Sequence, residues 1–173
     1  RQQLVVARAA AGKGFDVVLF DSAATPPLLS PDLFRDLVMP ALRVYREGLR
    51  GIIPSGSSAP AAPSLIMGGD TALVLEYLVS LDPGFLICPA ETDQRAFMEA
   101  MRGKPGIGVR LNMNVSALMD PDERLAMKEA ERVASVALET AVTGRPVLVG
   151  TGVLPVDADP ARILRLADLV SRL

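Results

Sequence analysis

Short apolar runs alternate with amphipathic segments along the whole chain. The runs are bounded by Gly, Pro, Ser and Asp, and they have the length and apolar character of strands that are buried on both faces. They cover residues 16–20 (DVVLF), 64–67 (SLIM), 85–88 (FLIC), 107–111 and 146–149. A segment with helical spacing follows each run. Apolar strands joined by helical crossovers predict an α/β protein with a parallel sheet.

The predicted helices begin at recognisable caps. Ser30-Pro31-Asp32 combines an N-cap residue, a proline at the first helical position and an acid near the positive end of the helix. In the helix that follows, one predicted face carries Leu33, Leu37, Ala41 and Tyr45, and Pro40 predicts a kink. The other predicted helices cover residues 2–12, 70–81 and 92–101, a long segment that starts at residues 120–123 (DPDE), and a last segment capped by Asp159-Pro160.

The length bounds the architecture. We expect 173 residues to form a single domain, residues 1–173. A closed (β/α)₈ barrel takes about 250 residues, so five βα units are too few to close one. They suffice for an open sheet or for the larger part of a barrel. Residues 51–63 (GIIPSGSSAPAAP) are rich in Gly, Ser, Pro and Ala, and we interpret them as a loop rather than a domain boundary.

Composition excludes several classes of function. The net charge of −2 and an aromatic content of 4% argue against a nucleic-acid or anionic-membrane surface. The chain contains no histidine, which removes Ser-His-Asp and Cys-His catalysis and every imidazole metal ligand. The single cysteine, Cys88, is predicted to be a small buried hydrophobic side chain. Because one cysteine cannot form an internal disulfide, we expect a reducing, cytoplasmic setting. No apolar run approaches the ~20 residues that span a bilayer.

Polar side chains follow the predicted strands at their carboxyl ends, where parallel α/β proteins bind ligands. The candidate substrate-binding residues are Asp21, Ser22, Asp70, Asn112, Asn114 and Thr151. No catalytic residue is assigned among them.

Each candidate also has a structural interpretation. The turn at residues 68–71 (GGDT) could hold an anion on its N–H groups, or it could be a tight turn with Asp70 as a helix cap. Asp21 could act as a general base or form a turn. Asn112 and Asn114 could donate to a ligand or satisfy loop backbone. The helical arginines are expected on solvated faces: Arg43, Arg46, Arg50, Arg162, Arg165 and Arg172.

Four segments, taken in order, resemble the uroporphyrinogen decarboxylase superfamily, which includes cobalamin-dependent methyltransferases. They are FDSAATPPLLSPDLFRDLVMP (20–40), GGDTALVLEYL (68–78), LNMNVSALMDPDE (111–123) and VGTGVLPVDADPARI (149–163). The resemblance implies a TIM (β/α)₈-type barrel with its pocket at the carboxyl ends of the strands. It also implies that this chain corresponds to the C-terminal part of that barrel, without the N-terminal portion.

The chain departs from the family at the zinc-binding positions, so no zinc is expected. The family's methyltransferases bind zinc at positions that correspond here to Ile66, Gly68 and Thr151, none of which is a zinc ligand. The decarboxylase branch normally carries a histidine where Thr151 stands. Ser22 matches the family's substrate-facing serine. Decarboxylation in this family needs no metal or cofactor, so no cofactor is expected in this chain, and a corrinoid would enter as substrate or as a partner's group.

Several functions remain open at this point. The first is a decarboxylase-like protein, a carboxy-lyase if active, that acts on or binds a tetrapyrrole or corrinoid-linked substrate. The second is a non-catalytic module that completes its barrel with a second copy or with the missing N-terminal portion, consistent with a mean hydropathy of +0.32. The third is a corrinoid methyltransferase, and the weakest is an unrelated open-sheet protein with a phosphate site at residues 68–71. The expected partners are a small tetrapyrrole or a corrinoid protein, with no nucleic acid and no membrane.

Overall fold

The fold was analysed in a computed structural model that describes residues 2–15, 17–21, 23–52, 64–141 and 144–172. The chain divides into two compact units, Arg1–Ile87 and Cys88–Leu173, which we call the N-terminal and C-terminal units. It is an α/β protein built from βα repeats, and the strand pairings described below are all parallel. The predicted fold class is confirmed at this level.

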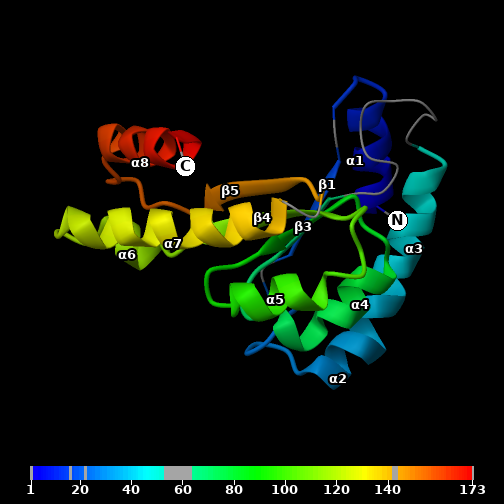
Figure 1. Cartoon of the computed structure of the whole chain (residues 1–173). Helices are drawn as coiled ribbons and strands as arrows, with labels where there is room; N and C mark the ends of the chain where they lie inside the picture. Colours follow the sequence, from blue (N-terminus) through cyan, green and yellow to red (C-terminus); the bar gives the residue numbers. More distant parts are fainter. Residues whose placement is uncertain (1, 16, 22, 53–63, 142–143, 173) are drawn as a thin grey trace. The chain divides into compact units, whose positions relative to one another are not determined.

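The N-terminal unit contains β1, β2 and all of β3 except its last residue, Cys88; β1 and β3 are labelled in Figure 1. Strand β1 pairs with β2 in the register Val18↔Ser64 to Asp21↔Met67, and β2 pairs with β3 from Ser64↔Phe85. The elements are α1 (Gln2–Ala11), β1 (Val18–Asp21), α2 (Pro31–Leu33), the π-helical segment η1 (Phe34–Val38), α3 (Met39–Arg50), β2 (Ser64–Met67), the 3₁₀ segment η2 (Ala72–Val74), α4 (Leu75–Ser80) and β3 (Phe85–Cys88).

The C-terminal unit is built around the parallel pair β4 and β5, with α7 packed against both strands and α8 packed against α7 (Figure 1). Its elements are α5 (Gln94–Ala100), β4 (Gly108–Met113), α6 (Val115–Met119), α7 (Glu123–Ala141), β5 (Val147–Thr151) and α8 (Pro160–Arg172).

In each unit, the two faces of the strands differ in how well they are covered. Successive side chains on a strand point to opposite faces. In the C-terminal unit Val109, Leu111 and Met113 are buried, whereas Arg110 and Asn112, on alternate positions of β4, are only partly buried. In the register of the pair, Arg110 lies beside Leu148 and Asn112 beside Gly150, and Leu148 is 56% exposed. We call Arg110, Asn112, Leu148 and Gly150 the open face of the β4–β5 pair.

The N-terminal unit shows the same contrast. Leu65 and Met67 are buried in its core, whereas Val18 and Phe20 on the alternate positions are 47% and 61% exposed. Parallel strands in α/β proteins are usually covered on both faces. The sequence prediction of strands buried on both faces is therefore wrong for β1, and for the exposed positions of β5.

The predicted apolar face of the first long helix is wrong because the helix is not regular. Leu33 and Leu37 are 47% and 64% exposed, and Ala41 is exposed too. Pro40 has no backbone N–H to donate, and the turn before it widens to a π-helix in which Met39 N–H bonds to Phe34 C=O. The extra residue rotates the apolar stripe, so the buried residues are Phe34, Met39, Leu42 and Leu49.

Most predicted boundaries agree with the structure, and Ser30 caps α2 through its hydroxyl as expected. Strands β2 and β3 have the predicted bounds, whereas β4 and β5 each continue two residues further than predicted, through Met113 and Thr151. Helix α6 was not predicted, and the predicted helix 70–81 begins as a 3₁₀ segment at Ala72. Residues 53–63 of the predicted loop lie outside the described residues.

Candidate functional site

The two acids of the N-terminal unit both bond to backbone. One carboxylate oxygen of Asp21 accepts hydrogen bonds from the N–H groups of Ala23 and Ala24 at 2.9 and 3.2 Å. The Asp70 carboxylate accepts from Ala72 N–H at 3.0 Å, at the start of η2. These contacts are those of a turn former and a helix cap. Ser22 lies outside the described residues.

The glycine turn after β2 is anchored to the loop that follows β1. Thr25 donates its hydroxyl hydrogen to the carbonyl of Gly68, and Asp70 N–H donates to Pro26 C=O at 3.2 Å. Gly69 has φ +72°, and a Cβ there would collide with the Pro26 carbonyl. Gly68 N–H also donates to Asp21 C=O. Because two N–H groups of this turn already have acceptors, the tight-turn interpretation is favoured over an anion-binding loop.

The open face of the β4–β5 pair carries a guanidinium without a described carboxylate partner. Arg110 lies in β4, and its Nη2 donates to Thr151 C=O at 2.7 Å across the strand pair. Gly150 lets the side chain cross: a Cβ at that glycine would lie 2.8 Å from the Arg110 Cζ atom. Arg110 forms no ion pair with a carboxylate of the described residues, and it is only partly exposed. A cation in this position can bind a ligand anion.

Asn112 is the neighbour of Arg110 on the same face, two residues nearer the carboxyl end of β4. Its side-chain oxygen is buried and has no hydrogen-bond partner among the described residues. Burying an amide oxygen without a donor costs about 1–3 kcal/mol, so a ligand or water donor would stabilise it. Asn112 therefore remains a candidate ligand-binding residue.

A chain of hydrogen bonds holds the backbone of this strand end in place. The Asn112 carbonyl accepts from the Gln94 side chain at 2.7 Å, and the Gln94 oxygen accepts from Arg132 at 3.1 Å. Arg132 pairs with Glu129, which in turn accepts from Asn114 N–H at 2.8 Å. The hydrogen bond to Glu129 raises the pKa of Arg132. Helices α5 and α7 thereby fix where β4 ends.

The remaining predicted residues are distributed as follows. The Asn114 side chain accepts from Ser116 N–H at 2.8 Å and caps α6, so it serves local backbone. Thr151 ends β5 opposite Met113, next to the pair Asn112 and Gly150. Asn112 and Thr151 therefore lie on adjacent strands of the C-terminal unit.

Sequence reasoning missed Arg110. The signal was the alternation in residues 108–113 (GVRLNM), where Arg110 and Asn112 occupy every second position between apolar residues. The expectation for the helical arginines is also wrong at two positions: Arg46 is only 17% exposed and pairs with Asp82, and Arg162 has two buried nitrogen atoms without a partner among the described residues.

The three residues that the sequence resemblance aligned with zinc ligands do not form a metal site. Ile66 is a partly buried member of β2, Gly68 follows that strand, and Thr151 offers a hydroxyl. Across the part of the chain that the structure describes, no group of three or more His, Cys, Asp or Glu side chains could hold a metal ion. Cys88 is fully buried, as predicted.

Comparison with protein-family models and with curated protein sequences gives no match for this chain. None of the described helices combines the length and apolar character needed to cross a membrane.

Proposed function

We propose that the protein binds a carboxylate-bearing tetrapyrrole, or a corrinoid-linked substrate, at the carboxyl end of the β4–β5 pair without using zinc. The observation that carries the proposal is Arg110, a partly buried guanidinium on the open face whose only hydrogen-bond partner among the described residues is the Thr151 carbonyl. The ordered motifs that resemble the uroporphyrinogen decarboxylase superfamily supply the substrate class. Under this proposal the activity, if present, is that of a carboxy-lyase of that superfamily.

The chemistry of the open face suits such a ligand. A guanidinium pairs with a carboxylate through two parallel hydrogen bonds, and Arg110 retains N–H donors beyond the one that it gives to Thr151. The buried oxygen of Asn112 requires a donor, which a pyrrole N–H provides. Asp21 and Asp70 have no such role in the proposal, because their contacts are with local backbone.

A titration with uroporphyrin, followed by its absorbance, tests the proposal. Arg110→Gln should weaken binding about 10-fold or more, since hydrogen bonds to a charged group contribute about 1.5–3 kcal/mol. Arg124→Gln is the matched control, because Arg124 is an exposed arginine of the same unit that pairs with Asp122. Cobalamin serves as the corrinoid arm of the same experiment.

Two results would contradict this function. One is that neither uroporphyrin nor cobalamin binds at high micromolar concentration. The other is equal affinity of the wild-type protein and Arg110→Gln, which would show that the open face takes no part in recognition.

A second candidate is a non-catalytic module that a second copy of the chain completes. The exposed side chains of Val18 and Phe20 in one unit and of Leu148 in the other favour it, because apolar strand faces in parallel α/β proteins are normally covered. Size-exclusion chromatography with light scattering tests it. A monomer of 18.3 kDa at micromolar concentration would exclude self-association as the means of covering these faces.

A further inference from the structure

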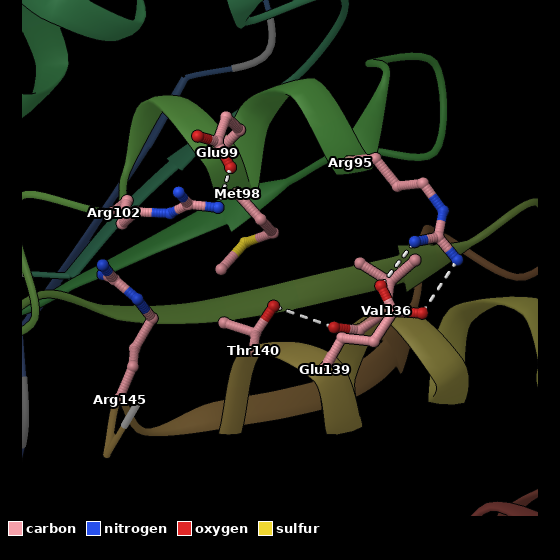
Figure 2. Close-up of a pocket in the computed structure, with 8 residues that line it drawn as sticks. All are labelled: Arg95, Met98, Glu99, Arg102, Val136, Glu139, Thr140 and Arg145. Carbon is pink, nitrogen blue, oxygen red and sulfur yellow. Dashed lines mark hydrogen bonds and ion pairs between the residues drawn. The ribbon is translucent and has the colours of Figure 1, made fainter. Parts of the chain in front are cut away.

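A second cationic site lies in the C-terminal unit, away from the open face. It is a pocket of about 210 Å³ between α5 and α7, close to the points where β4 and β5 begin. Figure 2 shows its lining residues: Arg95, Met98, Glu99, Arg102, Val136, Glu139, Thr140 and Arg145. In this view Arg102 and Arg145 lie at one end of the pocket and Arg95 at the other.

The charges that line the pocket do not balance. It has three guanidinium groups but only two carboxylates, and both carboxylates are already paired. Glu139 forms two hydrogen bonds with Arg95, one of them at 3.1 Å, and Glu99 pairs with Arg102. One positive charge, that of Arg145, therefore has no counter-ion among the residues that the structure describes.

Arg145 is also the most deeply buried cation of the pocket, with only 4% of its surface exposed. Its two terminal nitrogens donate to the carbonyls of Ile107 and Met101, which account for two of its five N–H donors. Burial lowers the pKa of Arg145 from its usual value. Two carbonyl dipoles compensate a buried charge only in part, so an anion in the pocket would be stabilised.

We propose that this pocket is an oxyanion site in which Arg145 and Arg102 bind inorganic phosphate or the terminal group of a phosphate monoester. Arginine presents donors in a planar fork that matches phosphate oxygens. The pocket volume is several times the ~30 Å³ that one water molecule occupies, so it has room for a tetrahedral anion. Met98 and Val136 supply an apolar wall that limits water around the bound group.

A purely structural role for Arg145 makes a different prediction. Met101 is the C-cap residue of α5, and a guanidinium on its carbonyl stabilises that helix end whether or not an anion is present. Substitution of Arg145 would then lower stability equally with and without phosphate. The dependence of stability on phosphate is therefore the informative measurement.

The test is thermal unfolding of the protein with and without phosphate at constant ionic strength. If phosphate at about 10 mM exceeds its Kd tenfold, it should raise Tm by about 3 °C, because ligand bound only to the folded state stabilises it. Arg145→Gln should abolish the rise. Broadening of the ³¹P resonance on addition of protein reports binding directly, and glycerol phosphate in place of inorganic phosphate distinguishes a monoester ligand from the free ion.

Two further variants keep the test decisive if Arg145→Gln fails to fold. Arg102→Glu changes an exposed residue and should remove both the Tm rise and the ³¹P broadening. Arg124→Gln, outside the pocket, should retain both. A Tm rise that is equal in all variants, or no broadening with the wild-type protein, would overturn the proposal. Arg110→Gln should leave the phosphate response unchanged, which separates this site from the proposed tetrapyrrole site.

Discussion

Two polar residues of each unit differ in how much of their hydrogen-bonding capacity nearby backbone already uses. In the N-terminal unit, Asp21 and Asp70 bond to nearby backbone N–H groups. In the C-terminal unit, Arg110 and Asn112 keep unused hydrogen-bonding capacity on a partly covered face. A polar side chain in or next to a strand can therefore be used up by a turn or keep groups that are free to bind a ligand. The hydrogen bonds that each side chain already makes decide between them.

Substitution of one glycine in each unit should give the largest difference in stability between the two units. Gly69→Ala should cost about 2–4 kcal/mol, because it combines a positive φ with a collision against backbone. Gly150→Ala should cost less than about 1 kcal/mol, because its Cβ meets only the Arg110 side chain, which can move away. Chemical denaturation measures both values.

The glycine comparison has a binding readout as well. Gly150→Ala should displace the Arg110 side chain. The variant should therefore bind uroporphyrin more weakly than the wild-type protein, even though it keeps the fold. Equal destabilisation by the two substitutions would show that the end of the β4–β5 pair is as tightly built as the glycine turn of the N-terminal unit.

Removing the side chains of Asp21 and Arg110 should have an intermediate effect on the free energy of unfolding. Asp21→Ala eliminates the acceptor of two backbone hydrogen bonds and should destabilise the protein by about 1 kcal/mol. Arg110→Gln removes a single bond to a carbonyl on a partly exposed face and should change stability by less than about 0.5 kcal/mol. Urea denaturation of both variants provides the comparison, and a larger loss for Arg110→Gln would assign that residue a structural role.

The smallest expected effect is the loss of stability of two ion pairs as the pH falls. The hydrogen bond from Arg95 lowers the pKa of Glu139 below its usual value, and the hydrogen bond from Arg35 does the same for Asp36 in the N-terminal unit. A carboxyl group with a lower pKa in the folded state contributes stability above its unfolded pKa, and this contribution is lost as pH falls through the folded pKa. Both pairs are solvent-exposed, so the contributions are small.

Glu139→Gln should accordingly reduce the fall in Tm between pH 7 and acidic pH, relative to the wild-type protein. Glu131→Gln, on an exposed position of the same helix, is the control. An unchanged acid dependence in Glu139→Gln would mean that the Arg95–Glu139 pair does not persist in solution.

Local sequence signals were sufficient where an element depends on its own residues. The strands 64–67 and 85–88 and the Ser30 cap agree with the structure, because apolar runs and capping side chains act within a few residues. The face of the helix around Pro40 could not be predicted from spacing. A single missing N–H widened one turn, and every later residue rotated with it.

The candidate site was predicted only in part for a similar reason. Asn112 was identified because it follows an apolar run. Arg110 was missed because a strand treated as buried on both faces leaves no position for a charge. The pocket around Arg145 gave no local signal, since its residues come from α5 and the turn after it, from α7 and from the segment before β5.

The amino-acid sequence alone was enough to give the order of the five strands, most of the helices and the absence of imidazole groups. These properties depend on composition and on contacts between near neighbours. The tertiary structure decided which face of each strand stays uncovered and which charges lose their partners. Both depend on segments about 40 residues apart, as when Arg110 meets the Thr151 carbonyl and Arg145 meets that of Ile107. Packing between such distant segments sets the burial of a charge, and burial determines whether that charge is available to a ligand.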